Sequence, residues 1–594
     1  MYKSVWRYVS FTELARCLEA TAITFVIQIA GTTLFFMRMP ITYYCLGIML
    51  QFAFTLGIRF SYRIFLIFKR KQMYQIDGVT HRVMMIGAGE AAQLIMRDIH
   101  KNPNNPDQIV CVIDDNSNKW NRYIEGVPIV GGRDDILKNV EKYDIDRIYL
   151  AIPNARVVDK RDILNICSET NCEIKQLPSM QVMVGAEVGV NMMQNVSVED
   201  LLGRETIRTD MKEVYDFIHD KVILVTGGGG SIGSELCRQI SAHKPAQLII
   251  FDIYENNAYD IQNELKSRYP DLNLVTLIGS VRDSRRINQV FEQYRPDVVY
   301  HAAAHKHVPL MEDSPCESIK NNVIGTYKTA YAAVVNGCKK FVLISTDKAV
   351  NPTNVMGASK RMCEMIIQSF DRKIKFGKLD DILPMFTHGD DDVRVYNKKE
   401  RFVAEDNGSA VRVYNKKEQY VTDFVAVRFG NVLGSNGSVI PLFKKQIAAG
   451  GPVTVTHPDI IRYFMTIPEA VSLVMQAGVY AKGGEIFVLD MGSPMKIDTL
   501  ARNLIKLSGF RPDEDIKIEY TGLRPGEKMY EEKLMDEEGL EKTPNELIHI
   551  GKPLDFDTDT FLMKLERLME SAYDNDPQIK RQVADIVTTY KIQE

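Results

Sequence analysis

A glycine-rich stretch directly after an apolar run restricts the fold of this chain more than any other feature. Residues 226–233 read Thr-Gly-Gly-Gly-Gly-Ser-Ile-Gly and follow Val-Ile-Leu-Val at 222–225. The pattern predicts a strand that turns sharply into a helix. Gly227 permits the turn, Gly230 lets the backbone approach a pyrophosphate, and Gly233 lets the helix pack closely on the strand. We therefore expect a parallel α/β sheet of the dinucleotide-binding kind.

An acidic residue ends the next apolar run. Leu-Ile-Ile at 248–250 is followed by Phe251 and Asp252. A carboxylate at this place accepts a hydrogen bond from a ribose 2′-hydroxyl and repels a 2′-phosphate, which favours NAD over NADP. The glycine pattern alone would also fit an ordinary β–α turn. Glycines, strand and acid together predict a site for NAD.

Length and composition limit the classes of protein to consider. A chain of 594 residues exceeds the size of a single hydrophobic core, so several domains are expected. A net charge of −4 gives no general basis for nucleic-acid binding, and we expect none. Nine scattered cysteines without a Cys-x-x-Cys pair indicate reduced thiols, with neither disulfides nor a metal site.

Two apolar runs lie near the N-terminus. Residues 20–37 and 40–58 are nearly continuous apolar sequence, each about as long as a bilayer core requires. Basic residues precede the first run and follow the second, and Arg38 is the only basic residue between the two runs. This distribution predicts that both ends of the hairpin face the cytoplasm. We expect a transmembrane hairpin within 1–75 that contacts the lipid bilayer through residues 20–58. A buried helical pair and a cleaved signal peptide are the alternatives.

The remainder divides into two α/β domains. Strands expected at 82–86, 109–113 and 147–152 define a first Rossmann-like domain over 80–195. Its glycine pattern, Gly-Ala-Gly-Glu-Ala-Ala at 87–92, is shortened, so nucleotide binding and a purely structural or regulatory role both stay open. A charged connector over 196–220 leads to the second domain.

The second domain covers 221–594 and is again predicted to be a doubly wound parallel sheet. One segment, 371–423, interrupts its strand–helix alternation. It contains Val-Arg-Val-Tyr-Asn-Lys-Lys-Glu twice, at 393–400 and 411–418. Two copies are too few for a solenoid. We interpret the segment as a surface insertion with a tandem duplication, and the alternating Val-Arg-Val-Tyr is compatible with a hairpin.

Chemically active side chains follow the strand predicted at 341–345. Thr346, Asp347 and Lys348 come directly after it, at the edge of the sheet where such folds bind substrates. Lys360 lies where short-chain dehydrogenase/reductase enzymes carry the lysine of their Tyr-x-x-x-Lys pair, and Met356 shares its helix face. Methionine cannot exchange a proton, so neighbouring groups have to supply acid and base. An exposed loop ion pair is the alternative for the adjacent Asp and Lys.

Four motifs in order carry a resemblance to a known family. They are Ser-Thr-Asp-Lys-Ala-Val-Asn-Pro at 345–352, His-Ala-Ala-Ala-His-Lys-His-Val-Pro at 301–309, Val-Arg-Phe-Gly-Asn-Val-Leu-Gly at 427–434, and Arg-Pro-Gly-Glu-Lys at 524–528. With them, nearly the whole chain outside 371–423 resembles the membrane-anchored nucleotide-sugar 4,6-dehydratases that act on UDP-N-acetylglucosamine. These are extended short-chain dehydrogenase/reductase proteins of capsule synthesis and protein glycosylation.

The chain departs from that family at three points. Such proteins often have four membrane helices where two are expected here. His305 stands where an aromatic residue is usual, and Ser280 replaces an aspartate near the adenine. Met in place of the catalytic Tyr resembles the long forms that retain the C5 configuration, so we expect retention.

The resemblance implies a reaction in three steps: oxidation at sugar C4, loss of water across C5 and C6, and return of the hydride to C6. It makes Lys348 the base at C5 and Asp347 the acid, with Thr346 orienting the sugar hydroxyl at O4. A lysine acts as a base near neutral pH only if its pKa falls, and we expect burial beside the nicotinamide and the charge of Lys360 to lower it.

The resemblance also implies binding residues. Those expected at the cofactor are Gly227, Gly230, Ser231, Ile232, Gly233, Asp252, Ser280, Val281, Ala302 and Lys360. Those expected at the UDP-sugar are His305, Lys306, Asn431, Arg462, Arg524 and Glu527. Arg462 and Arg524 are predicted pyrophosphate ligands. Asn431 is assigned to the phosphate side and Glu527 to the uridine ribose.

Two other functions remain open. One is a 4-epimerase on the same UDP-sugar, which needs no chemistry at C5 and C6. The other is a catalytically silent, NAD-sensing membrane scaffold. We further expect a homo-oligomer, located as a multi-pass protein in the bacterial inner membrane with its catalytic domains in the cytoplasm.

Overall fold

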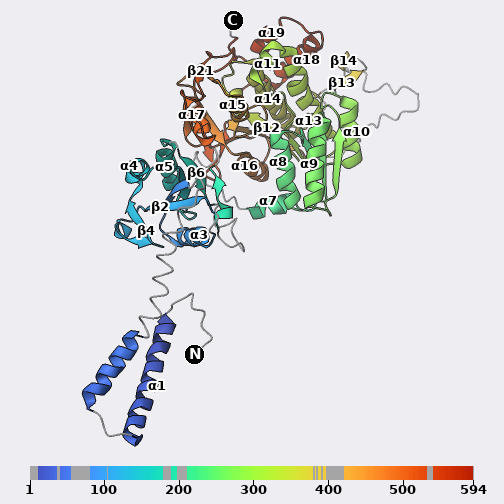
Figure 1. The fold of residues 1–594 in the computed structure, drawn as a ribbon. Coiled ribbons are helices and arrows are strands. Elements are labelled where there is room, and N and C mark those ends of the chain that lie inside the picture. The colour runs from blue at the N-terminus through green and yellow to red at the C-terminus, as the bar shows by residue number, and fades with distance from the viewer. Residues whose placement is uncertain are drawn as a thin grey trace. The chain divides into compact units, whose positions relative to one another are not determined.

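The computed structural model describes residues 11–35, 40–54, 81–102, 105–170, 172–177, 189–196, 211–378, 381–382, 385–388, 392–395, 421–531 and 539–592. The chain forms two compact units, one made of 1–81 with 104–108 and the other of 82–103 with 109–594. Figure 1 shows the helices and strands of each unit.

The described residues of the first unit include α1 (Phe11–Phe35) and helical residues 41–54. They meet where the Thr32 hydroxyl and the Tyr44 hydroxyl lie 2.7 Å apart. Within the described residues, no helix combines the length and the apolar character that crossing a bilayer demands. Polar residues such as Gln28 interrupt the apolar sequence of α1. The structure thus contradicts the transmembrane hairpin.

Two further predictions, which depended on the hairpin, are also wrong. Bilayer contact through residues 20–58 and a multi-pass location in the inner membrane both depended on two spanning helices. The sequence argument used the apolar content and length of each run and the basic residues that flank the pair, whereas none of the described helices has the length and hydropathy that a span requires.

The second unit begins with a seven-stranded sheet in the order β3-β4-β2-β1-β5-β6-β7. The strands predicted at 82–86, 109–113 and 147–152 are confirmed as β1, β2 and β5. The strands are β1 (His81–Ile86), β2 (Asp107–Ile113), β3 (Tyr123–Ile124), β4 (Val127–Gly131), β5 (Arg147–Leu150), β6 (Glu173–Gln176) and β7 (Gln194–Asn195). The helices are α3 (Glu90–Lys101), α4 (Ile136–Tyr143) and α5 (Val157–Ser168). Because β1 lies between β2 and β5, the crossovers on its two sides run in opposite directions.

A nine-stranded sheet follows, in the order β10-β9-β8-β11-β12-β15-β19-β23-β22. Its first seven members pair in parallel, and β23 joins antiparallel to β19. The strands are β8 (Val222–Thr226), β9 (Gln247–Asp252), β10 (Leu274–Ile278), β11 (Val298–His301), β12 (Lys340–Thr346), β15 (Asp423–Phe429), β19 (Ile486–Leu489), β22 (Glu541–Lys542) and β23 (Ile548–Gly551). The parallel α/β sheets of the predicted fold are therefore present.

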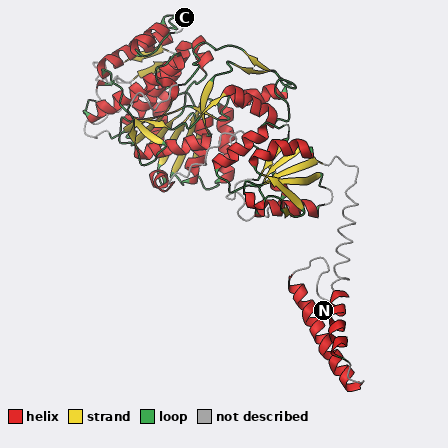
Figure 2. Cartoon of the chain, turned by 90° about the vertical axis from the view of Figure 1, so that its left-hand side faces the viewer, coloured by secondary structure: helices red, strands yellow, loops and turns green. Residues whose placement is uncertain are grey.

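Helices cover both faces of this sheet (Figure 2). Alternate residues of β8 enter different cores: Leu224 belongs to one and Val225 to the other, as the period of two in a strand requires. The core around Val225 includes residues of α7 (Met211–Ile218), α8 (Ser231–Ala242), α9 (Glu255–Arg268) and α16 (Ile467–Tyr480). The core around Leu224 includes residues of α10 (Ser284–Tyr294), α13 (Gly325–Val335), α14 (Val355–Lys375), α18 (Thr558–Tyr573) and α19 (Ile579–Ile586).

Smaller elements surround the carboxyl ends of the strands. The short helices after β11 are α11 (Val308–Asp313) and α12 (Pro315–Ser318). A separate core forms beside two small sheets, one of β16 (Asn431–Val432), β18 (Ile461–Met465) and β20 (Pro494–Lys496), the other of β17 (Val453–Val455) and β21 (Ile518–Tyr520). It is completed by α15 (Val439–Ala448) and α17 (Ile497–Leu507).

The predicted insertion starts later than its sequence limits suggested, because α14 continues to Lys375. A two-stranded antiparallel sheet follows, β13 (Met385–His388) with β14 (Asp392–Val395). The start of the first repeat copy therefore pairs with the segment before it. The second copy, 411–418, lies outside the described residues.

Candidate active site

The glycine-rich turn between β8 and α8 has the predicted backbone geometry. Gly227 adopts a φ of +68°, and a Cβ there would lie 2.7 Å from the backbone nitrogen of Ala303. A Cβ on Gly233 would overlap the carbonyl oxygen of Gly227. These positions accept only glycine without a shift of the backbone, which confirms the tight turn and the close packing of helix on strand.

Asp252 connects the end of β9 to this turn. Its Oδ2 accepts a hydrogen bond from the Gly229 amide at 2.8 Å, and its Oδ1 accepts one from the Tyr254 amide at 2.8 Å. The carboxylate is buried and held by two backbone donors, so its direction is fixed before any ligand binds. Its contact with a ribose stays a prediction.

The other predicted cofactor residues lie on neighbouring strand ends and helices. Ser280 follows β10 and accepts a hydrogen bond from the Arg282 amide at 3.2 Å, while Val281 beside it is buried. Ala302 follows β11 and borders the turn, because a Cβ on Gly227 would lie 2.8 Å from its carbonyl carbon. Ser231 and Ile232 begin α8.

Lys360 and Met356 are both buried on α14. The Lys360 ammonium donates to the Ile344 carbonyl at 2.9 Å, and burial lowers the pKa of this lysine. An ammonium has three donors, so Lys360 retains donor capacity for a ribose hydroxyl. Met356 offers no titratable group.

His301, which ends β11, is fully buried. Its Nδ1 lies 2.8 Å from the Thr226 hydroxyl and its Nε2 lies 3.0 Å from the Thr326 hydroxyl. Burial, with a smaller contribution from Lys360, lowers the pKa of His301 to about 3. The neutral imidazole therefore links three elements of the core, and no group of metal ligands occurs in the described part of the chain.

The side chains after β12 form a compact charge cluster. The Lys348 Nζ lies 3.0 Å from Asp347 Oδ1, 2.9 Å from Glu531 Oε1 and 3.2 Å from Asn431 Oδ1. The Thr346 hydroxyl donates to the same Asp347 oxygen at 2.8 Å. The predicted acid, base and orienting hydroxyl are thus brought together, and a second carboxylate that the sequence argument missed joins them.

The pKa of Lys348 shifts opposite to the sequence expectation. Burial disfavours its charged form, but the carboxylates of Asp347 and Glu531 outweigh burial and raise its pKa. Burial first, then the neighbouring Asp347 charge, raises the pKa of Glu531 to about 6. Asp347 is buried as well, yet Lys348 and the hydrogen bonds from Glu531 and Thr346 lower its pKa. Without ligands, Lys348 is therefore an ammonium.

A buried ion pair supports the strand ends beneath this cluster. Arg428 on β15 contacts both oxygens of Glu364 on α14 at 2.7 Å, and neither side chain is exposed. The Ser345 hydroxyl, one residue before Thr346, donates to the same carboxylate at 2.6 Å. The pair ties β12, β15 and α14 together directly below the reactive side chains.

The predicted substrate residues are brought together only in part. Arg462 on β18 donates to the carbonyls of Ile461 and Lys528 and lies 3.1 Å from Glu527 Oε1. It also contacts Glu531 at 3.4 Å. Its guanidinium thus clamps the segment around Glu527, so contact with a pyrophosphate would require these bonds to rearrange.

Arg524 is exposed, and its amide donates to Glu527 Oε2 at 3.2 Å. His305 and Lys306 follow β11 and are exposed. The His305 amide donates to Asn322 Oδ1 at 2.8 Å, and the Lys306 ammonium lies 3.4 Å from the Ser435 hydroxyl. Their contacts with a UDP-sugar stay predictions.

Nothing in the sequence indicates that Glu531 belongs to the site, apart from its position three residues after the Arg-Pro-Gly-Glu-Lys motif. It lies in an irregular segment, and only the fold brings it to Lys348. A sequence argument could have found Glu531 only by considering every carboxylate near that motif.

Comparisons with known proteins agree with this architecture. The family model described as "Polysaccharide biosynthesis protein" matches residues 223–383 and 401–553, and one described as "CoA-binding domain" matches 1–178. The capsular polysaccharide biosynthesis protein CapD of Staphylococcus aureus is 41% identical over 93% of this chain and 84% of its own length.

Two relatives with named activities match about half of this chain. The UDP-N-acetylglucosamine 4,6-dehydratase (inverting) of Campylobacter jejuni is 33% identical over 52% of this chain and 76% of its own length. The UDP-glucose 4-epimerase of Rickettsia canadensis is 33% identical over 54% of this chain and 79% of its own length. The extent of the family match and the similarity to CapD over nearly the whole chain lead to one conclusion: the chain belongs to the polysaccharide biosynthesis protein family.

Proposed function

We propose that the chain is a 4,6-dehydratase that uses tightly bound NAD and converts UDP-N-acetylglucosamine to the UDP-4-keto-6-deoxy sugar, for surface polysaccharide or glycoprotein synthesis. One observation carries the proposal. Lys348 lies within 3.0 Å of two carboxylates, Asp347 and Glu531, at the carboxyl end of a sheet strand. Oxidation at C4 needs one base, whereas elimination of water also needs an acid, and this cluster offers both.

The cofactor fits the residues present. Glycine at 227 and 233 leaves space that a Cβ would fill, and Asp252 is fixed toward the turn by two amides. When bound, NAD accepts a hydride from the sugar C4 and returns it to C6. Lys360 would hold the nicotinamide ribose through its remaining donors.

The charge cluster supports a closed proton cycle. Lys348 first passes a proton to Glu531, the carboxyl whose raised pKa of about 6 makes it the best acceptor. The neutral Lys348 amine then removes the C5 proton. Glu531 returns its proton through Asp347 to the C6 hydroxyl, which leaves as water. When the hydride returns to C6, the Lys348 ammonium gives a proton to C5, and the proton released from O4 restores the Lys348 charge, so that each side chain ends in its starting state.

Thr346 completes the set at O4. Its hydroxyl donates to Asp347, so a proton from the sugar O4 hydroxyl can enter the same network where Met356 offers no acceptor. This arrangement replaces the tyrosine of ordinary short-chain dehydrogenases.

Product analysis tests the proposal. Purified full-length chain incubated with UDP-N-acetylglucosamine should form a 4-keto-6-deoxy sugar, identified by the C6 methyl signal in NMR. UDP-N-acetylgalactosamine would indicate a 4-epimerase, the second candidate, which the similarity to the Rickettsia enzyme favours. Absence of any product from folded, NAD-loaded protein would contradict both.

A further inference from the structure

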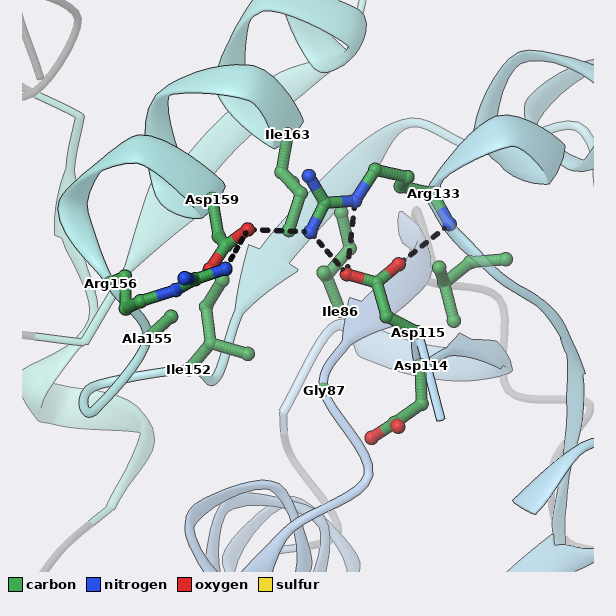
Figure 3. A pocket seen from close by; sticks show the side chains of 11 residues that line it. Ile86, Gly87, Asp114, Asp115, Arg133, Ile152, Ala155, Arg156, Asp159 and Ile163 are labelled. Carbon is green, nitrogen blue, oxygen red and sulfur yellow. Dashed lines mark hydrogen bonds and ion pairs between the residues drawn. The ribbon is translucent and has the colours of Figure 1, made fainter. Parts of the chain in front are cut away.

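A cavity of about 370 Å³ opens in the first α/β sheet, outside the site described above (Figure 3). It lies at the carboxyl ends of β1, β2 and β5. The crossovers on the two sides of β1 run in opposite directions, and α/β sheets bind ligands in the crevice at such a point. Its lining includes isoleucines, and its charged residues are Asp114, Asp115, Arg133, Arg156 and Asp159.

The acid at the end of β2 repeats the arrangement of the proposed NAD site. Asp114 Oδ2 accepts a hydrogen bond from the Ala88 amide of the β1–α3 turn at 2.7 Å, and its Oδ1 accepts one from the Asn116 amide at 2.9 Å. Asp252 contacts the equivalent two amides in the second sheet. The first sheet therefore has the same acid-to-turn bridge, although its glycine pattern is shortened.

Two guanidinium groups meet at one carboxylate beside this bridge. Arg133 lies 3.2 Å from Asp159 Oδ1, and the Arg156 Nε lies 2.8 Å from Asp159 Oδ2. Arg156 is 83% exposed, and ion pairs at such positions are weak. A phosphate, which carries more charge and accepts more hydrogen bonds than a carboxylate, can displace Asp159 from both arginines.

The usual phosphate position in such folds is less suitable. Glu90 occupies the first turn of α3, where its charge opposes a phosphate. The Ala88 amide of that turn is already bonded to Asp114. The arginine pair is therefore the better anion site of this cavity.

A second carboxylate adds selectivity at the sugar. Asp115 contacts the Arg133 guanidinium at 2.6 and 3.0 Å and follows Asp114 directly, so two acids stand at the end of β2. Carboxylates there accept hydrogen bonds from ribose hydroxyls and repel a phosphate attached to the ribose. Lys119, 2.9 Å from Asp114 Oδ2, offsets the charge of Asp114, so Asp115 carries most of this repulsion. Coenzyme A carries such a phosphate on its 3′-oxygen.

We propose that this cavity binds a nucleotide with a diphosphate and an unsubstituted ribose, in preference to coenzyme A. The arginine pair holds the diphosphate, and the acids at the end of β2 hold the ribose hydroxyls. This site is separate from the proposed catalytic cluster and does not depend on its assignment.

The chain contains a natural reporter for the test. Trp120 donates its indole N–H to the Asp114 carbonyl at 2.7 Å. The sequence has two tryptophans, so Trp6→Phe leaves Trp120 alone as the source of tryptophan fluorescence. Full-length Trp6→Phe protein is titrated with coenzyme A and with dephospho-coenzyme A, which differ only in the 3′-phosphate. Protection of residues 152–163 from hydrogen exchange provides a second readout.

We expect saturable binding of dephospho-coenzyme A and at least tenfold weaker binding of coenzyme A. Arg133→Gln should weaken dephospho-coenzyme A at least tenfold, whereas Asp159→Asn, which frees both arginines, should tighten it. Arg97→Gln is the control, since Arg97 pairs with Glu125 outside the cavity. Equal or tighter binding of coenzyme A would overturn the selectivity. Failure of both probes to change either readout in folded protein would overturn the site.

Discussion

Replacement of Glu531 by Gln tests the proposed proton cycle at the carboxylate that the sequence did not predict. At 2.9 Å from Lys348, two unit charges interact by about 6 kcal/mol in an effective dielectric of ~20. That value is an upper limit here, because the Lys348 side chain is 24% exposed and Asp347 remains beside it. General acid–base contributions are worth about 10² to 10⁴ in rate, or about 3 to 5 kcal/mol.

We therefore expect Glu531→Gln to lower kcat at least 100-fold. The KM for the UDP-sugar should change little, because the loss is in proton transfer. Glu531→Asp, which keeps a carboxyl group, is the matched variant and should retain part of the rate. Steady-state product formation followed by NMR or coupled chromatography gives both constants.

The pH profile adds a second criterion. Glu531 must be ionised to accept the Lys348 proton, and its pKa is about 6, so wild-type kcat should fall as the pH drops below 6. That acid limb should disappear from the residual activity of Glu531→Gln. A Glu531→Gln enzyme within threefold of wild type, with the limb unchanged, would refute the cycle.

Three further predictions concern other residues. Lys348→Met should oxidise C4 and then stall, so that reduced nicotinamide absorbance rises and persists after substrate is added; turnover within a few-fold of wild type would remove Lys348 as the base. Arg428→Met removes the closest cation from the buried Glu364 carboxylate, which keeps only Ser345 and the more distant Arg361 at 3.7 Å, and should cost about 3–5 kcal/mol in denaturant unfolding; a loss below 1 kcal/mol would show that the pair is not structural. His301 has a folded pKa of about 3, below its value of 6.5 in the unfolded chain, so its contribution to stability is complete above pH 6.5 and falls as the pH drops toward 3. His301→Gln should flatten that part of the stability profile, and an unchanged slope would contradict burial as the cause.

The parts of the site that the sequence predicted are those encoded locally. The turn at Gly227, the close packing at Gly233 and the acid at Asp252 depend on residues within one β–α–β unit, where spacing dictates geometry. The same is true of Thr346, Asp347 and Lys348, which follow one strand. Such features can be located from a single sequence.

Long-range contacts explain what the sequence did not predict. Glu531 reaches Lys348 only through the fold, and its charge adds to that of Asp347 in reversing the expected pKa shift of that lysine. Arg462 was predicted to bind a pyrophosphate, yet its guanidinium contacts Glu527 and the segment around it. The N-terminal hairpin was predicted from the apolar content, length and flanking charges of two runs, and the described helices did not meet the requirement for a span.

An isotope measurement tests the proposed dehydration most directly. UDP-N-acetylglucosamine that carries deuterium at C4 is incubated with the full-length chain in ordinary water, and the product is examined by NMR. Internal hydride return predicts that the deuterium appears in the C6 methyl group of a 4-keto sugar. Deuterium that stays at C4 of an epimerised sugar, or that is lost to solvent, would contradict the proposal.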